Sequence, residues 1–478
     1  MTLDIVVILL YVAAMLGLGF YGMRRAKTRE DYLVAGRNLG PGFYMGTMAA
    51  TVLGGASTIG TVRLGYVYGL SGFWLCATLG LGIVGISLFL AKPLLKLKIF
   101  TVTQVLERRY SPTARTASAA IMLIYALMIG AISTIAIGTV MGVLFDLPFW
   151  VSILIGGGIV VAYSTVGGMW SLSLTDIVQF LIMTIGLVFI LMPMSISDAG
   201  GWDALVAKLP ASYFSMTAIG WDTIITYFLI YFFGIFIGQD IWQRVFTARS
   251  EKVAKVAGSA AGIYCVLYGL AAAIIGMAAK VLIPDLENVN NAFASIVQLS
   301  LPDGVRGLVI AAALAALMST ASAGLLAAST TAAQDLWPLL RKGKGNESSA
   351  HENRIFTFLL GLVVLAIALV VSDVISALTM AYNLLVGGML IPLLGAIYWK
   401  HASTAGAIAS MALGSLTACV FMYIDGLDAD SFNSDQDAID SFRFKQRLQK
   451  EFFDCFVSFP RWLSTGRRIT PNQRDNVR

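Results

Sequence analysis

The chain has 478 residues, of which 58% are hydrophobic and 13% are charged, and its mean hydropathy is +0.79. Soluble domains carry about 25% charged residues, so this composition excludes an ordinary soluble protein and predicts an all-α polytopic membrane protein. The net charge of +6 lies largely in the connections between apolar segments and requires no nucleic-acid partner, and two histidines leave little basis for a zinc site or an enzyme.

Twelve apolar segments are long enough to span a bilayer, which requires about 20 helical residues. They fall at about 3–23, 41–64, 69–92, 117–146, 148–168, 172–195, 221–243, 255–281, 304–336, 354–372, 374–398 and 402–424. The loops after the first, third, seventh, ninth and eleventh segments are rich in Lys and Arg, whereas the alternate loops carry mainly Asp and Glu. The positive-inside rule therefore predicts that the N-terminus lies outside the cell.

Two of these segments contain residues that weaken a helix at mid-membrane. Segment 41–64 carries Gly54 and Gly55 among small polar residues, and segment 221–243 carries Gly234 and Gly238 before a polar cluster. Glycine costs about 1 kcal/mol relative to alanine inside a helix, and irregular backbone at this depth is tolerated where it lines a cavity. Interrupted helices at matching positions of two halves are typical of inverted-repeat transporters. The alternative is that these glycines only allow close helix packing.

A run of hydroxyl side chains in segment 304–336 is the next unusual feature. Ser319, Thr320 and Ser322 share much of one helical face, and Ala316 lies one turn earlier. Hydroxyls inside a bilayer need hydrogen-bond partners, and together with freed backbone carbonyls they offer the neutral oxygen cage that a sodium ion prefers. The alternative is again that small residues let two helices approach closely.

Four stretches combine glycines, hydroxyls and charged residues within apolar segments. They are AATVLGGASTIG at 49–60, YSTVGGMWSLSLTDIVQF at 163–180, GQDIWQR at 238–244 and ALMSTASAGLLAAS at 316–329. In combination these stretches resemble the sodium:solute symporter family, which includes sodium-coupled sugar, proline and sialic acid carriers. The resemblance extends over roughly residues 1–424 and implies a ten-helix core of two inverted five-helix repeats with broken helices.

On this basis we expect six parts of the chain. They are a peripheral first helix with an inner loop at 1–40, a first repeat at 41–195, an outer loop at 196–220, a second repeat at 221–398, a peripheral last helix at 399–424 and an atypical charged tail at 425–478. The tail is too charged to span a bilayer. Residues 441–457 are expected to form an amphipathic helix on the membrane surface, unless the tail is not the family's original ending.

The resemblance also implies a sodium site between the second and ninth segments. Ala50, Leu53 and Ala316 match positions whose backbone carbonyls bind the ion, and Ser319 and Thr320 match its two hydroxyl ligands. The chemistry agrees with this match, because a broken helix frees carbonyls that can replace part of the hydration shell of sodium. A proton-coupled carrier, which would not need the hydroxyl pair, is the alternative.

Asp176 is an acidic residue inside a predicted span and is therefore a functional candidate. In similar family members this aspartate and hydroxyls of the ninth segment hold a second sodium ion or act in gating. Ser322 matches one such hydroxyl, but Ala323 stands where members with two sodium ions have serine. Alternatively, Asp176 caps a helix end with Ser173 or Thr175.

The solute pocket is expected beside the break in the second segment. The predicted lining residues are Gly54, Gly55, Ser57, Thr58, Arg63, Phe73, Trp74 and Tyr231. Arg63 is the basis for expecting a small carboxylate as the solute, and its alternative role is that of an arginine reaching to the membrane interface.

These features predict a secondary transporter in the plasma membrane that couples inward sodium movement to uptake of a small organic solute by alternating access. The sodium ion is co-transported, and no obligatory protein partner is evident. A membrane solute sensor without transport and a passive channel are the alternatives from other functional classes.

Overall fold

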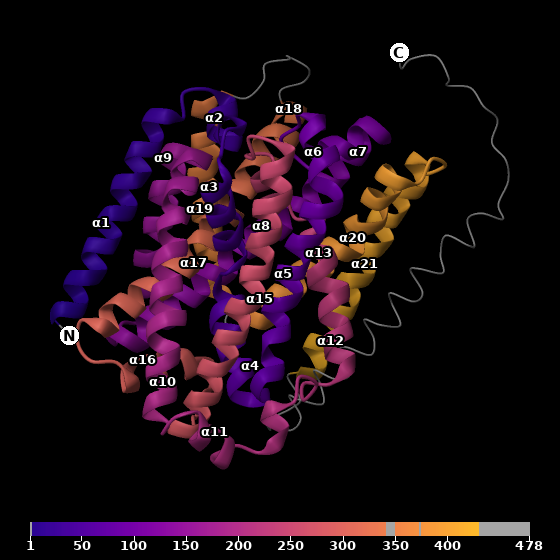
Figure 1. Cartoon of the computed structure of the whole chain (residues 1–478). Helices are drawn as coiled ribbons and strands as arrows, with labels where there is room; N and C mark the ends of the chain where they lie inside the picture. The colour runs from indigo at the N-terminus through magenta and orange to yellow at the C-terminus, as the bar shows by residue number, and fades with distance from the viewer. Residues whose placement is uncertain (1, 341–348, 372–373, 430–478) are drawn as a thin grey trace.

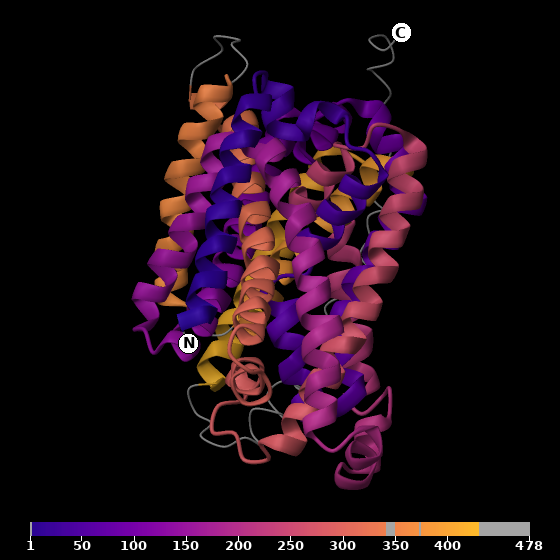
Figure 2. The same ribbon diagram turned by 60° about the vertical axis from the view of Figure 1, so that its left-hand side comes forward.

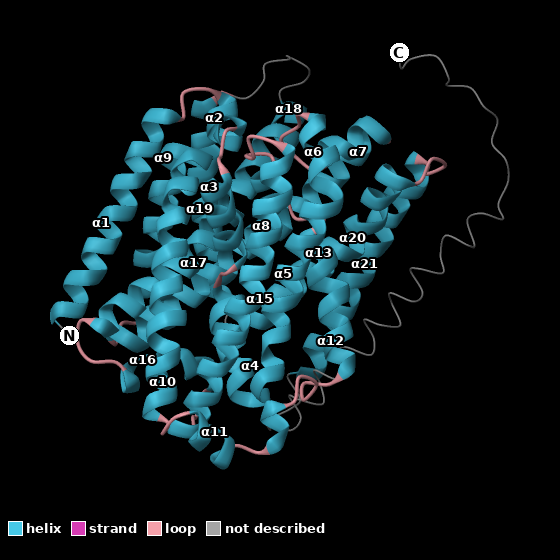
Figure 3. Ribbon diagram, viewed as in Figure 1, coloured by secondary structure: helices cyan, strands magenta, loops and turns pink. Residues whose placement is uncertain are grey.

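The computed structural model describes residues 2–340, 349–371 and 374–429. Within these residues every regular element is helical, apart from one isolated bridge between Leu39 and Ala248 (Figure 3). The predicted all-α fold is therefore confirmed. The predicted surface helix at 441–457 lies outside the described residues, and 425–429 belong to the last helix of the described part.

The main helices are, in chain order, α1 (Thr2–Arg25), α2 (Arg29–Val34), α3 (Pro41–Val52), α4 (Thr61–Tyr68), α5 (Trp74–Gly85), α6 (Ala91–Leu97), α7 (Thr103–Arg109), α8 (Pro112–Phe145), α9 (Phe149–Met183), α10 (Met192–Asp198), α11 (Trp202–Lys208), α12 (Trp221–Tyr227), α13 (Phe233–Ile235), α14 (Gln239–Val245), α15 (Glu251–Leu282), α16 (Ala292–Ser300), α17 (Val305–Thr331), α18 (Trp337–Leu340), α19 (Ala350–Val370), α20 (Val374–Tyr398) and α21 (Thr404–Ala429). The 3₁₀ and π segments are η1 (Ala35–Arg37), η2 (Ala56–Gly60), η3 (Gly69–Phe73), η4 (Ile86–Leu90), η5 (Thr184–Leu191), η6 (Ala211–Phe214), η7 (Phe228–Phe232), η8 (Val289–Asn291) and η9 (Ala332–Leu336).

Short-range signals fix where several helices begin. Ser111 and Ser250 accept hydrogen bonds from the first turns of α8 and α15, and Thr28 begins α2 with a capping box. Ser349 and Glu352 form a second capping box at the start of α19. Each of these side chains satisfies backbone N–H groups that have no partner within the helix.

Eight helices of the described part are long and apolar enough to cross a membrane, and the bent pair Trp221–Ile235 with Gln239–Val245 adds a ninth. The protein is therefore a multi-pass membrane protein. Two of the eight, Ala56–Leu97 and Phe149–Asp198, contain 42 and 50 residues. At 1.5 Å per residue, a straight helix of 50 residues would measure about 75 Å. This length is more than twice the roughly 30 Å of a bilayer core. Each must therefore contain more than one crossing.

The longer helix folds back at Gly168, whose φ of +54° is left-handed. After this residue, Ser171 donates to the carbonyl of Gly19, and Gln179 donates to Tyr11. These contacts run backwards along α1, so this half of the helix is antiparallel to α1. The other half, before Gly168, packs against α8 and α19. The predicted boundary between segments 148–168 and 172–195 agrees with this reversal, while the total of twelve spans and the inverted repeats stay predictions.

The two ends of the helix bundle differ in their connections. In Figure 1, α2, α6, α7 and α18 lie at the upper end, whereas the N-terminus, α11 and α16 lie at the lower end. Figure 2 shows the same division after a 60° turn. The basic loops meet at the upper end, where Arg37 donates to the carbonyl of Ile99 and Arg109 to that of Lys400. The basic residues 341–344 lie outside the described residues.

Both predicted interruptions are present and lie at the centre of the bundle. The first helix stops at Val52, Leu53 leaves helical geometry at φ −82° and ψ 62°, and the chain resumes helical form at Ala56. The second helix bends by 51° between Ile235 and Gln239. Beside both breaks runs α17, whose apolar stretch is 94% buried. The predicted broken helices are thus confirmed, and they bring polar backbone groups to the most buried helix of the described part.

Candidate functional site

Two hydroxyls of α17 lie against the carbonyl groups that the first break releases. The Oγ of Ser319 donates to the carbonyl oxygen of Ala50 at 2.7 Å and to that of Ala316 at 2.8 Å. The Oγ1 of Thr320 donates to the carbonyl of Thr51 at 2.8 Å and lies 3.4 Å from that of Ala50. Four of the five residues expected to bind sodium are therefore in direct contact.

A glycine makes this close approach possible. A Cβ atom on Gly54 would lie 2.4 Å from the Oγ1 of Thr320, closer than any real Cβ contact. Leu53, the fifth expected ligand, lies in the break itself, and its carbonyl is 3.5 Å from the Oγ1 of Thr58. The missing side chain at Gly54 thus lets α17 reach the broken backbone.

These oxygens are of the kind that a sodium ion prefers. Ala50, Leu53, Ala316 and Ser319 are fully buried, and all the donors are neutral. Each hydroxyl now donates to a carbonyl, and by rotating it can instead turn a lone pair toward a cation that those carbonyls also face. Such a set binds a hard monovalent cation without a carboxylate, and so weakly enough to release it.

Asp176 joins three helices rather than capping one. Its carboxylate accepts a hydrogen bond from Thr47 of α3 and lies 3.5 Å from the guanidinium of Arg244 in α14, with both charged side chains fully buried. Of its two alternative partners, Thr175 donates to carbonyls of its own helix. Ser322, expected to act with Asp176, donates to the carbonyl of Ser319 at 2.9 Å. The role of the pair in gating or in a second ion site stays a prediction.

A small cavity of about 30 Å³ lies between the two breaks. This volume admits one or two water molecules, so the cavity is too small for an organic solute in this conformation. The first broken helix lines the cavity with Thr51, Gly54, Gly55 and Ser57, and the facing polar residues are Ser133 of α8, Asp240 of α14, Thr320 of α17 and Tyr382 of α20. Thr320, one of the expected sodium ligands, therefore also borders the cavity.

Of the eight predicted pocket residues, Gly54, Gly55 and Ser57 line this cavity. Thr58 lies next to them and shares a hydrogen bond with the hydroxyl of Tyr268. Tyr231 lies behind the cavity wall, edge-on against Tyr382 with ring centroids 5.4 Å apart.

The remaining predicted pocket residues do not line the cavity. Arg63 donates to the side-chain oxygen of Asn290 at 2.9 Å, and Trp74 donates to the carbonyl of Met216 at 2.7 Å. Phe73 contacts Trp74 in a tilted arrangement, with ring centroids 4.7 Å apart. Their part in solute binding stays a prediction.

Sequence reasoning missed four polar residues of the cavity, Thr51, Ser133, Asp240 and Tyr382, of which Asp240 is the most informative. Asp240 is 3% exposed and accepts a hydrogen bond from Tyr125 at 3.2 Å. It lies in the quoted stretch GQDIWQR, and an acidic residue beside a mid-membrane glycine was a sufficient signal for it. Ser133 and Tyr382 carry no such signal, because hydroxyl and aromatic residues are common in membrane helices.

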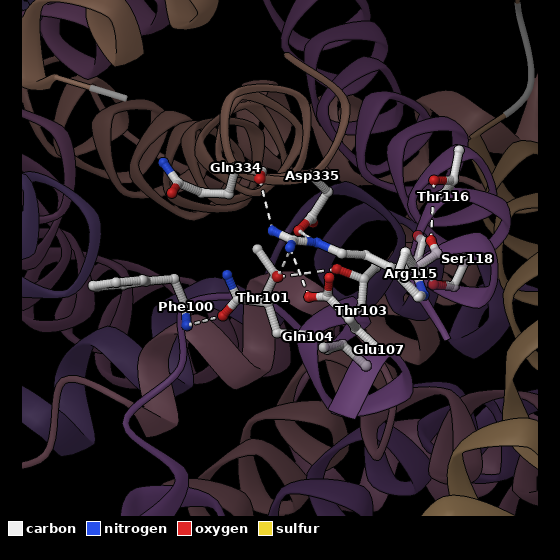
Figure 4. Close-up of polar contacts among 12 residues, drawn as sticks. Phe100, Thr101, Thr103, Gln104, Glu107, Arg115, Thr116, Ser118, Gln334 and Asp335 are labelled. Carbon is white, nitrogen blue, oxygen red and sulfur yellow. Dashed lines mark hydrogen bonds and ion pairs between the residues drawn. The ribbon is translucent and has the colours of Figure 1, made fainter. Parts of the chain in front are cut away.

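A polar network lies at the end of the bundle where the basic loops meet (Figure 4). Arg115 of α8 donates to Asp335 of η9 at 2.9 Å, to Glu107 of α7 at 2.7 Å and to the carbonyl of Gln334 at 2.7 Å. Thr101 donates to the same carboxylate of Asp335 at 3.0 Å. One arginine therefore ties α8, α7 and the end of α17 together.

Comparisons with known proteins agree with this arrangement. The model of the sodium:solute symporter family matches residues 32–414. Sodium/proline symporters of Staphylococcus aureus strains JH9 and NCTC 8325 / PS 47 are each 26% identical over 439 residues, covering 87% of this chain and 85% of theirs. The solved structure of a substrate-bound, outward-open Na⁺-coupled sialic acid symporter matches 87% of this chain and 97% of its own with a TM-score of 0.74 and 22% identity, which shows a common fold. The family match covers most of the chain, and this protein belongs to the sodium:solute symporter family.

Proposed function

We propose that this protein is a secondary active transporter of the plasma membrane, which couples inward sodium movement to uptake of a small organic solute by alternating access. The observation that carries the proposal is the contact of Ser319 and Thr320 with the carbonyls of Ala50 and Thr51. Those carbonyls are free only because the helix is broken there. Sodium, as the co-transported ion, would join the broken helix to α17.

This site explains how ion and solute binding are coupled. Gly54 and Thr320 border both the sodium site and the central cavity. An ion that holds the break against α17 also orders one wall of the cavity, so sodium strengthens solute binding. By thermodynamic linkage, the solute must strengthen sodium binding by the same factor.

The driving force is sufficient for concentrative uptake. One elementary charge that crosses 100 mV contributes about 2.3 kcal/mol, and a tenfold sodium gradient adds about 1.4 kcal/mol. One sodium ion per cycle would therefore support a solute gradient of several hundredfold. The rocking of one helix bundle against the other would expose the site first outside and then inside.

The donor set favours sodium over protons as the coupling ion. The oxygens that meet at Ser319 and Thr320 are hydroxyls and carbonyls, which do not take up a proton near neutral pH. A carrier driven by protons would instead need a titratable group at this position. The carboxylate part of the predicted function depends on Arg63, which lies off the cavity, so the structure adds no support to it.

Sodium binding can be tested without knowing the solute. Na⁺ should raise the thermal unfolding temperature of the purified protein above its value in KCl of equal ionic strength. Ser319→Ala and Thr320→Ala should each remove most of this rise, because each deletes an ion ligand. Ser329→Ala is the matched control, since Ser329 is a buried serine of the same helix that donates to Leu326.

Transport by the same variants completes the test. Protein in liposomes should accumulate its solute when an inward sodium gradient is imposed, and the two site variants should lose this accumulation while the control keeps it. Sodium-specific stabilisation that survives in both site variants would contradict the proposed site. Stabilisation without any solute movement would favour a sensor over a transporter.

A further inference from the structure

The buried charges of the described residues do not balance at the central cavity. Three of the four most deeply buried carboxylates have an ion-pair partner. These pairs are Asp4 with Arg306 at 2.8 Å, Asp176 with Arg244 at 3.5 Å and Asp335 with Arg115 at 2.9 Å. The fourth, Asp240, has a hydrogen bond from Tyr125 and no basic side chain within ion-pair distance in the part of the chain that the structure describes.

The nearest basic side chain makes its ion-pair contact with another carboxylate. Arg244 lies one helical turn further along α14, but its ion-pair contact is with Asp176. Two buried carboxyl groups therefore share the neighbourhood of a single guanidinium group inside the bundle. The backbone at the start of α14 and the hydroxyl of Tyr125 offset part of this cost, yet a membrane protein rarely buries a carboxylate without a cationic partner.

Asp240 lies where a solute would bind. It lines the cavity between the two breaks, together with Thr51 and Ser57 of the first broken helix. Ser133, also in the lining, is 1% exposed, and its hydroxyl has no hydrogen-bond partner in the described part of the chain. A buried polar atom without a hydrogen-bond partner is energetically unfavourable. A ligand that hydrogen-bonds to Ser133 and pairs with the carboxylate of Asp240 would therefore gain binding free energy from both contacts.

The aromatic wall of the cavity suits a cation as well. Tyr382 lines the cavity and is held edge-on by Tyr125 and Tyr231, each with its ring centroid 5.4 Å away. A Cβ atom on Gly234 would lie 2.1 Å from the ring of Tyr382, so this glycine makes room for the ring. The face of an aromatic ring attracts ammonium groups. An anionic solute would instead meet the charge of Asp240.

We propose that the solute carries a cationic nitrogen, which binds the carboxylate of Asp240 beside the ring of Tyr382 and the hydroxyl of Ser133. This inference rests on the proposed transport function and specifies its substrate class as small organic amines or quaternary ammonium compounds. It makes Asp240 the residue that selects the solute, while Ser319 and Thr320 hold the sodium ion.

Matched pairs of compounds test this preference. The thermal unfolding temperature of the full-length protein would be measured in NaCl with L-proline, choline or putrescine. The matched analogues that lack the cationic nitrogen are, in the same order, N-acetyl-L-proline, 3,3-dimethyl-1-butanol and 1,4-butanediol. At least one cationic compound should raise the unfolding temperature in a saturable way, and its partner should not.

Variants then assign the preference to one carboxylate. Asp240→Asn should weaken the apparent affinity for the stabilising cation at least roughly 30-fold, because it removes one charge of a buried pair. Asp240→Glu keeps the charge and should keep the preference for cations. Asp222→Asn is the matched control, since Asp222 is an exposed aspartate in the first turn of α12, at the far end of the same broken helix.

Sodium separates this inference from the proposed function. Asp240→Asn should keep the stabilisation by Na⁺, which also shows that the variant is folded. The inference is wrong if no cationic compound stabilises the wild type, if the uncharged partner acts equally well, or if Asp240→Asn binds the cation unchanged. Loss of the sodium effect in Asp240→Asn would make Asp240 an ion ligand and would also overturn it. If sodium does not change the unfolding temperature of the wild-type protein, that result would instead refute the proposed function.

Discussion

At the scale of single residues, Gly54 connects the broken helix to the ion site. A side chain at this position would collide with Thr320, whose Cβ and Oγ1 lie 2.5 and 2.4 Å from the place of the new Cβ atom. The Cβ atom of Thr320 is fixed by the backbone of α17, and its methyl group also lies close at 2.8 Å, so rotation of the side chain cannot relieve the collision. Gly54→Ala should therefore push α17 from the break and abolish stabilisation by sodium.

The control for this prediction lies in the same helix. Gly42→Ala would place its Cβ in open space, with no atom within 4 Å, and should leave the sodium-dependent unfolding temperature unchanged. The measurement is the difference in unfolding temperature between NaCl and KCl. Equal differences for Gly54→Ala and the wild type would show that the contact with Thr320 is not needed for the ion.

The contact between the two parts of the expected sodium site could be predicted from the sequence more fully than the lining of the cavity, for a physical reason. Ser319 and Thr320 place two hydroxyl groups in an apolar segment, and the glycines at 54–55 predict a helix break. Each half of the expected site can therefore be recognised from its own local sequence. The cavity lining depends on which side chains meet between the first broken helix and five other helices, α5, α8, α14, α17 and α20. Arg63 has the charge of a ligand, but its orientation toward Asn290 follows from tertiary packing. No local pattern contains that information.

At the scale of helices and loops, the network around Arg115 is expected to close the end of the bundle where the basic loops gather. Arg115 joins α8 to Asp335 beyond α17 and to Glu107 of α7. Its side chain is 21% exposed, while that of Asp335 is fully buried. Removing one partner of such a pair leaves the other charge buried and unpaired. Arg115→Ala should therefore loosen this closure and favour conformations that are open at this end.

Thiol accessibility would measure this opening. A cysteine introduced by Thr331→Cys, at a buried position one turn before Asp335, would be placed in a chain whose four native cysteines are replaced by alanine. Arg115→Ala should raise its reaction rate with a water-soluble maleimide by roughly tenfold, which corresponds to about 1.4 kcal/mol. Arg109→Ala is the control, because Arg109 is partly exposed and contacts the carbonyls of Trp399 and Lys400 and the ring of Tyr110, with no ion pair to a buried carboxylate in the described part of the chain. Equal rates in all variants would show that the network is not a closure.

Helices with long apolar stretches could be predicted from the sequence, whereas the contacts between helices were less predictable. The spans follow from apolar length alone, and the reversal at Gly168 agrees with the predicted gap between the fifth and sixth segments. The network around Arg115 was not foreseen. Its members lie up to 234 residues apart in the chain, and each alone resembles an ordinary loop charge or helix end.

At the scale of the whole molecule, the orientation in the membrane decides whether a sodium gradient drives uptake. The basic loops meet at one end of the bundle, and the N-terminus lies at the other with α11 and α16 (Figure 1). Cytoplasmic loops are enriched in Lys and Arg. We therefore predict that the end with the N-terminus faces outward, where sodium is abundant.

Labelling from one side of the membrane tests this orientation. Ser212→Cys in η6 and Ser403→Cys before α21 are exposed positions at opposite ends of the predicted topology. In intact cells a membrane-impermeant maleimide should modify the first variant, and it should reach the second only after the membrane is permeabilised. The parent chain without cysteines reports background labelling. The reverse pattern would place the basic loops outside. Sodium from outside the cell would then have to reach the ion site through the end of the bundle that the Arg115 network is expected to close. That result would contradict the proposed direction of transport.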